Sequence, residues 1–162
     1  MAHNELIVYC DGACFPNPGK GGWGWVTEDR AYFDSGHIAR ATNQVMELKA
    51  AIEATKRFAE ANRLLIVRTD SQYVVNGITT WIHDWVQNDW HTQSGQPVKN
   101  QDLWFELLLY TAHSLVKFEW VRGHDGNSGN EEADKLATLA SKANPELIKK
   151  LKAQWHKKPA GI

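Results

Sequence analysis

The chain has 162 residues, of which 43% are hydrophobic and 23% charged, as expected for one globular domain with a sizeable core. The formal net charge is −1 and the isoelectric point about 6.6, so the basic excess common in nucleic-acid binders is missing. No apolar run reaches the length of a membrane span, and the first residues lack a leader pattern. These features predict a cytoplasmic protein without a membrane partner. Its cysteines, Cys10 and Cys14, are expected to be free thiols.

The first part of the chain has the pattern of three strands. Leu6–Cys10 is apolar on both alternating faces and ends at Asp11, and residues 23–27 and 31–38 are expected to form two further strands. Residues 16–22 are expected to form a turn-rich loop, because their glycines and prolines disfavour a helix or a central strand. The three strands are therefore expected to form an antiparallel meander.

A helical period follows over residues 43–59, and Thr42 or Asn43 can cap its first turn. The run 64–67 is continuously apolar, which is typical of a buried parallel strand. Ser71 is suited to cap a short helix that ends near Asn76, and Gly77 is expected to break it.

The second half alternates between helices and one strand. We expect helices over 81–90, 100–113 and 131–142, a polar loop over 91–98, a strand over 115–121, and a final lysine-rich helix from Pro145. Three meandering strands followed by helix, strand, helices, strand and helix predict an α/β fold, with one mixed sheet and helices on both faces.

Four carboxylates occupy suggestive places in this pattern. Asp11 and Asp70 follow strands, where ligand sites of α/β folds usually lie. Glu47 lies in the first turn of its helix, and Asp134 adjoins the apolar face of another. Three of the acids have an ordinary alternative role. Glu47 can be an acid that the helix dipole favours near the start of its helix, Asp70 can cap a strand end, and Asp134 can be a solvated residue. Asp11, directly after five apolar residues, is harder to explain in that way.

Four converging carboxylates would repel one another strongly, and a divalent cation removes that cost. A site made of oxygen ligands suits Mg²⁺ or Mn²⁺. The spacing therefore makes a metal site a hypothesis to be weighed against four unrelated acids.

The local sequences around the acids add a family resemblance. The segments that carry it, in chain order, are Asp11–Cys14, Asn17–Gly19, Thr42–Leu48, Thr69–Val74, Gly77–Ile82, Pro97–Trp104 and Trp120–Gly126, followed by Asn130 and Asp134. Within a stretch from about Ile7 to Ala140 they resemble type 1 ribonuclease H, in particular the bacterial form with a Trp-rich protrusion.

The resemblance implies a ribonuclease H-like fold, with a five-stranded mixed sheet whose first three strands are antiparallel and whose last two are parallel. It implies a catalytic domain over residues 1–143, followed by a basic helical tail over 144–162. It also implies two Mg²⁺ ions, with Mn²⁺ as an alternative, that clamp the scissile phosphate of an RNA–DNA hybrid and leave 5′-phosphate and 3′-hydroxyl ends.

By the same resemblance, Asp11 bridges both ions, Glu47 and Asp70 serve the ion that activates water, and Asp134 serves the ion near the leaving oxygen. His124, in a glycine-flanked loop, is expected to transfer a proton or to assist product release. The protein is expected to act as a monomer.

The resemblance also implies substrate contacts, because a hybrid offers 2′-hydroxyls and base edges in a wide minor groove. Asn17, Asn43, Gln44 and Gln72 are expected to read the RNA strand, although turn or cap roles would also explain them. Arg40, Thr42 and Asn100 are expected to contact a phosphate of the DNA strand, and Trp81 is expected to contact its sugars. Lys99, just after the protrusion, is a further expected substrate contact.

The chain departs from the family pattern in its protrusion, because residues 85–96 keep the aromatic residues and have no lysine or arginine. Fewer cations predict weaker hybrid binding with a shallower salt dependence. Two alternatives remain, a catalytically silent hybrid-binding module and another nuclease of the ribonuclease H-like superfold. The presence of all four acids and His124 disfavours the first, and the matched segments disfavour the second.

Overall fold

The computed structural model describes residues 5–123, 126 and 128–157. Its sheet has five strands in the order β3-β2-β1-β4-β5. The first three strands are antiparallel, and β4 and β5 run parallel to β1, so the expected mixed sheet is confirmed. Its strands are β1 (Glu5–Phe15), β2 (Gly19–Thr27), β3 (Phe33–Ala41), β4 (Leu64–Thr69) and β5 (Val116–Trp120).

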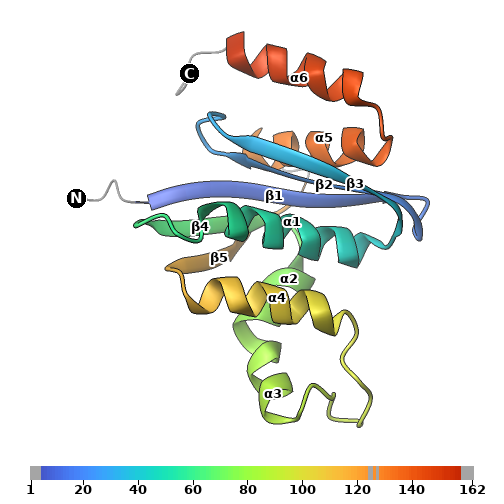
Figure 1. Ribbon diagram of the computed structural model, residues 1–162, viewed down its shortest axis with the longest axis vertical. Helices are drawn as coiled ribbons and strands as arrows, with labels where there is room; N and C mark the ends of the chain where they lie inside the picture. The colour runs from blue at the N-terminus through green and yellow to red at the C-terminus, as the bar shows by residue number, and fades with distance from the viewer. Residues whose placement is uncertain (1–4, 124–125, 127, 158–162) are drawn as a thin grey trace.

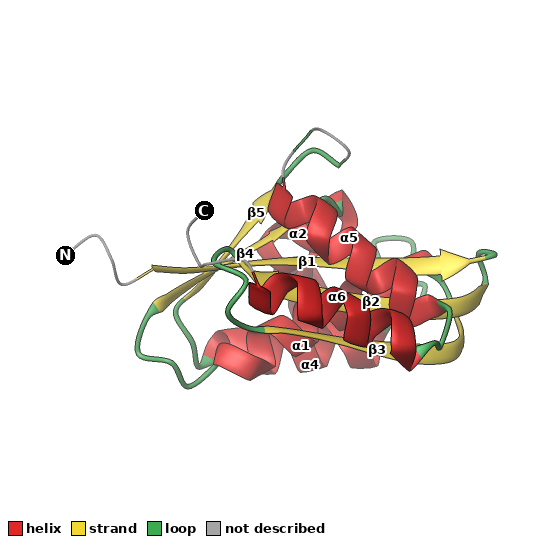
Figure 2. Ribbon diagram, turned by 90° about the horizontal axis from the view of Figure 1, so that it is seen from above, coloured by secondary structure: helices red, strands yellow, loops and turns green. Residues whose placement is uncertain are grey.

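Helices cover both faces of the sheet. On one face lie α1 (Asn43–Phe58) and α4 (Gln101–Ala112), and on the other α5 (Ser128–Ser141) and α6 (Pro145–Lys157) (Figure 1). Apolar side chains of β1, β2 and β4 pack with α1 and α4 in the larger core, and a smaller core joins the sheet to α5 and α6. Figure 2 shows the sheet running between these helices. No described helix has the length and apolar content needed to span a membrane.

The glycine-rich stretch was predicted to be a loop as far as residue 22, and this prediction was wrong. The turn ends at Pro18, and β2 begins at Gly19 as a central strand between β3 and β1. The glycines serve close packing against α5. A Cβ atom on Gly22 would lie 2.2 Å from the carbonyl oxygen of Ala137, and one on Gly24 would lie 2.5 Å from the Cβ of Leu136. Glycine thus lets α5 approach the middle of the sheet.

Gly77 does not break the helix that Ser71 caps, contrary to the sequence-based prediction. The chain continues from α2 (Gln72–Asn76) through a π-helical turn (Gly77–Trp81) into α3 (Ile82–Gln87), and Gly77 keeps right-handed helical angles. A Cβ atom here would lie 2.0 Å from the Trp104 ring, so the missing side chain at Gly77 leaves room for this ring of α4. The helix expected to reach Trp90 ends at Gln87, and the residues before the next loop include Asp89 and Trp90 with positive φ.

The last helix packs against the protein. Leu151 and Trp155 of α6 are buried, and the Trp155 ring meets the edge-strand residue Phe33 edge-to-face, with the ring centroids 4.6 Å apart. Its lysines lie on the remaining surface, where Lys149, Lys150 and Lys152 are exposed. The α6 helix is therefore an amphipathic helix that covers the smaller core between the sheet, α5 and α6.

Candidate metal centre

Two neighbouring parallel strands bring Asp11 and Asp70 together. The register pairs Tyr9 of β1 with Arg68 of β4, so the residues two positions further on lie side by side where β4 ends. Asp11 is only 5% exposed, and its Oδ1 accepts a hydrogen bond of 2.9 Å from the Gly12 amide. The strand pattern therefore places one buried and one partly buried carboxylate at the same point of the sheet.

Glu47 reaches this point from α1, one residue beyond its first turn. The helix begins where the Thr42 hydroxyl accepts a hydrogen bond of 3.2 Å from the Val45 amide. Met46 and Leu48, on either side of Glu47, are fully buried, so the helix is anchored around the acid. The predicted cap at Thr42 is confirmed, whereas Glu47, predicted in the first turn, lies just beyond it, because the helix already begins at Asn43.

Ser71 links Glu47 to the start of α2. Its Oγ accepts a hydrogen bond from the Val74 amide (3.1 Å), as the sequence predicts for a cap, and donates one to Glu47 Oε2 (2.8 Å). The second bond was not predicted. The local signal was the position of Ser71 next to Asp70, but only the fold brings the helix that carries Glu47 against it.

Three carboxylates meet closely enough to hold a cation. Each of Asp11, Glu47 and Asp70 offers an oxygen, and these oxygens all lie within 4.8 Å of one another. A ligand set made only of oxygen suits a hard divalent ion such as Mg²⁺ or Mn²⁺. The residues present therefore fit such an ion.

Asp134 approaches the group from α5. Gly24 is the cross-strand partner of Asp11, and the close packing of α5 over Gly24 brings the helix beside Asp11. The two acids share a side-chain hydrogen bond, and the negative charge of Asp134 acts on Asp11. Asp134 is not one of the three acids that meet within 4.8 Å, so it flanks the group next to Asp11.

Burial and mutual repulsion disfavour the charged form of the carboxylates in this centre, and a bound cation would offset both effects. Burial raises the pKa of Asp11 well above its usual value, and the charges of Asp70 and Asp134 raise it further, against the Gly12 hydrogen bond. Burial also raises the pKa of Glu47; the Ser71 hydrogen bond opposes this, and the charge of Asp70 adds to it. The pKa of the fully buried Cys10 thiol rises for the same reasons, with burial first and Asp11 next.

The residues expected to read the RNA strand surround the start of α1 and α2. Asn17, exposed in the turn after β1, accepts a hydrogen bond of 3.1 Å from the Asn43 amide through its Oδ1. Gln44 and Gln72 are exposed in the first turns of their helices. The β1–β2 turn is thereby tied to α1, and two amide side chains are left open to solvent.

The residues expected at the DNA strand, and Lys99, lie on several elements. Arg40 and Thr42 are exposed at the end of β3 and the start of α1, and Lys99 is exposed before α4. Asn100 has a positive φ of 60°. Its Nδ2 donates a hydrogen bond of 3.1 Å to the Tyr73 hydroxyl, which fixes the side-chain amide next to the first residue of α4.

Trp81 belongs to an aromatic cluster at the base of the protrusion. It is 38% exposed, and its ring lies 6.2 Å from Tyr73 and 6.1 Å from Trp85. The Tyr73 hydroxyl also accepts a hydrogen bond of 3.1 Å from Trp104 Nε1. Tyr73 thus joins the Trp81 and Asn100 positions, a role that its local sequence did not predict. His124 lies outside the described residues.

Comparison with known proteins gives consistent matches. The family model described as RNase H matches residues 3–142. A Ribonuclease H of Dinoroseobacter shibae is 47% identical over 142 residues, which cover 82% of this chain and 88% of the relative. A Ribonuclease HI of Rickettsia prowazekii is 40% identical over 148 residues, which cover 90% of this chain and 97% of the relative.

Solved structures match the fold as well. The crystal structure of LC9-RNase H1, described as a type 1 RNase H with the type 2 active-site motif, has a TM-score of 0.76 and 32% identity, covering 86% of this chain and 72% of that one. LC11-RNase H1 in complex with RNA/DNA hybrid has a TM-score of 0.64 at 21% identity, covering 85% of this chain and 97% of that one, a likeness of fold alone.

Proposed function

Because the chain belongs to the ribonuclease H family, as a type 1 enzyme, we propose that it cuts the RNA strand of RNA–DNA hybrids internally, with two Mg²⁺ ions. The products would be 5′-phosphate and 3′-hydroxyl ends. The observation that carries the proposal is the meeting of Asp11, Glu47 and Asp70 within 4.8 Å, built only from oxygen ligands.

The carboxylates would divide the ions between them. Asp11, the most buried acid, would contact both ions, Glu47 and Asp70 would hold one, and Asp134 would hold the other. When bound, the ions would activate the attacking water and stabilise charge on the scissile phosphate. Mn²⁺ accepts the same ligands. The hydrogen bond from Ser71 would keep Glu47 in place before the ion arrives.

The substrate is proposed from the surface around the centre. The open amides of Gln44 and Gln72 suit the 2′-hydroxyls and base edges of an RNA strand, and the Trp81 ring suits DNA sugars. Solved proteins of the same fold include one bound to RNA/DNA hybrid. His124 would move a proton during cleavage or product release.

A catalytically silent hybrid-binding module is the main alternative. Such a module needs no costly cluster of like charges, yet here the cluster is intact and supported by a hydrogen bond. Another nuclease of the same superfold is disfavoured by the family match over residues 3–142. We also propose a cytoplasmic, monomeric enzyme, which cell fractionation and mass measurement in solution would test.

The decisive assay uses an RNA–DNA hybrid labelled on each strand in turn, with Mg²⁺ or Mn²⁺. Cleavage of the RNA strand alone is expected, with duplex DNA and duplex RNA left intact. The Asp70→Asn variant should lose activity by at least a hundredfold, whereas Glu53→Gln, a surface acid of the same helix as Glu47, should keep it. Cleavage without metal, or equal activity in Asp70→Asn, would overturn the proposal.

A further inference from the structure

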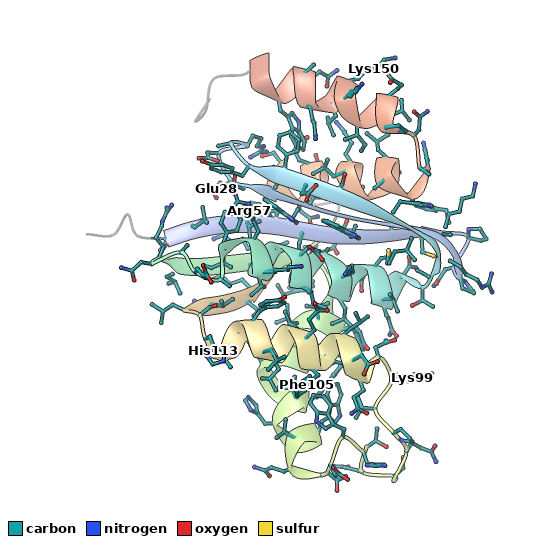
Figure 3. The ribbon with its side chains drawn as sticks, viewed as in Figure 1. Glu28, Arg57, Lys99, Phe105, His113 and Lys150 are labelled. Carbon is teal, nitrogen blue, oxygen red and sulfur yellow. The ribbon has the colours of Figure 1, made fainter. Side chains whose placement is uncertain are left out.

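A second feature with the chemistry of nucleic-acid binding lies beside the β2–β3 hairpin, at the edge of the sheet, where α1 and α6 each contribute one residue from opposite faces. It is a cavity of about 300 Å³ whose wall combines aromatic rings with two cations and one acid: Trp25, Tyr32, Phe33, Arg57, Lys152 and Asp34. Figure 3 shows Arg57 at the same end of the sheet as the hairpin residue Glu28.

The two cations are held over aromatic rings. The Arg57 guanidinium carbon lies 5.5 Å from the centre of the Tyr32 ring and 5.1 Å from that of Phe58. The Lys152 Nζ lies 5.6 Å from the centre of the Phe33 ring. Across the described ranges of the chain, neither cation has a carboxylate within ion-pair distance. Their charges are therefore positioned without being neutralised.

The neighbouring acids are engaged elsewhere. Glu28 pairs with Arg68 at 3.6 Å, and Asp29 accepts hydrogen bonds within its own turn from Thr27 (2.7 Å) and Ala31 (2.9 Å). Asp34 is the acid that lines the cavity, and its Oδ1 accepts a hydrogen bond of 2.8 Å from the Ser35 amide. Two cations against one acid leave the cavity with a positive balance, and Asp34 can still accept a hydrogen bond from a base or sugar.

Tyr32 supplies the surface for stacking. The residue is 54% exposed, and its ring is held by an edge contact with Phe58 at 6.4 Å. An exposed ring of fixed orientation beside unneutralised cations is the combination with which proteins bind single-stranded nucleic acid, through stacked bases and neighbouring phosphates.

This cavity is separate from the metal centre. Strand β2 lies between the edge strand β3, which carries Phe33 and Asp34 of the cavity, and β1, which carries Asp11. None of the four acids of the metal centre is among the residues that line the cavity. A strand bound in the cavity would thus lie apart from the scissile phosphate.

We propose that the cavity binds a single-stranded nucleic-acid segment, with one base on Tyr32 and adjacent phosphates at Arg57 and Lys152. The choice of ligand rests on the proposed function, since a nuclease acting on hybrids meets single-stranded flanks. The binding itself needs neither the carboxylates nor the divalent ions.

The test is fluorescence anisotropy with a labelled single-stranded DNA decamer in the presence of EDTA. The double variant R57Q/K152Q should bind at least tenfold more weakly than the unaltered chain. The control K149Q/K150Q removes the same charge from exposed lysines that do not line the cavity, with Lys150 at the outer side of α6 (Figure 3). Its affinity should change less than twofold.

A second pair of variants tests the stacking. Tyr32→Ala should weaken binding roughly 5- to 150-fold, whereas Tyr32→Phe should bind as the unaltered chain does. An equal loss in both lysine-containing double variants would overturn the proposal, because it would indicate diffuse attraction. Competition by a polyglutamate peptide at the affinity of the decamer would also overturn it, because it would indicate a site for acidic peptides.

Cleavage of a short blunt hybrid separates this inference from the proposed function. R57Q/K152Q should cleave it at the normal rate, with an unchanged melting temperature. Absence of cleavage by the unaltered chain, with decamer binding that still depends on Arg57 and Lys152, would refute the proposed function alone. Normal cleavage with no decamer binding would refute the second site alone.

Discussion

Replacing Asp70 by Asn should make the metal-free protein more stable. Burial raises the pKa of both Asp11 and Glu47, and the charge of Asp70 raises each of them further. The three carboxylates meet within 4.8 Å, and folding without a cation must bring these charges together. Asn keeps nearly the same shape and removes one of them.

The size of the effect follows from the distance. Two unit charges at the upper limit of 4.8 Å repel by about 3.5 kcal/mol at an effective dielectric constant of about 20. Protonation of Asp11 relieves part of this, so a gain of about 1–2 kcal/mol is expected, which corresponds to roughly 3–6 °C in melting temperature for a chain of this length. The control Glu53→Gln breaks a surface pair with Lys49 and should cost no more than about 0.5 kcal/mol.

The sign of the pH dependence follows from the raised pKa of Asp11. A carboxyl whose folded pKa lies above its unfolded value contributes stability that is fully present below the unfolded pKa, near 4, and is lost as the pH rises through the folded pKa. The advantage of Asp70→Asn should therefore widen from pH 4 to pH 8.

Thermal and urea denaturation in EDTA would measure this difference, followed by titration with Mg²⁺. Added Mg²⁺ should stabilise the unaltered chain more than the variant, because binding to the folded state adds to stability. A variant that is less stable than the unaltered chain at pH 8, or an advantage that does not change with pH, would refute the electrostatic reasoning.

Four further substitutions test the packing and the hydrogen bonds of Ser71. Gly24→Ala should destabilise the fold by about 1–3 kcal/mol, because the new methyl group overpacks against α5, and it should lower kcat, since α5 carries Asp134. Gly77→Ala should cost a similar amount by clashing with Trp104, and it should chiefly raise KM for the hybrid. If both variants change the same kinetic constant, α5 and the Trp104 region do not serve catalysis and binding separately. Trp155→Ala should lower the free energy of unfolding by about 3–5 kcal/mol in urea denaturation. A loss below about 1 kcal/mol would mean that packing of α6 does not stabilise the smaller core. Ser71→Ala should cost about 1–2 kcal/mol and raise the Mg²⁺ concentration needed for activity, while Ser71→Thr should restore both.

Much of the fold could be predicted from local pattern. The continuous apolar run before Asp70 predicted the buried parallel strand, and the helical period from Asn43 predicted α1 to within a residue of its observed end at Phe58. Both signals are periodic in the chain itself. They place Asp70 at the end of β4 and Glu47 near the start of α1. Asp11 was predicted to follow the first strand, but β1 continues past it to Phe15 because those residues pair with β2.

Glycine was the residue that local pattern misjudged. In β2 and at Gly77, the sequence suggests a flexible break, but the structure uses the absence of a side chain to admit a neighbouring helix or ring. Such packing depends on residues such as Leu136 and Trp104, which are distant in the chain. The bond between Ser71 and Glu47 escaped prediction for the same reason, because 24 positions separate them.

The net charge of the chain is a poor guide to its nucleic-acid partner, because the sequence does not count bound metal ions. The formal value of −1 counts the site acids as bare carboxylates. Two bound divalent ions, as we propose, would bring the loaded protein to about +3, with the added charge placed where a scissile phosphate must sit. Because residues 85–96 contribute no lysine or arginine, the attraction for a hybrid would come mostly from the ions. Affinity for the hybrid should then follow the divalent-ion concentration closely and monovalent salt weakly.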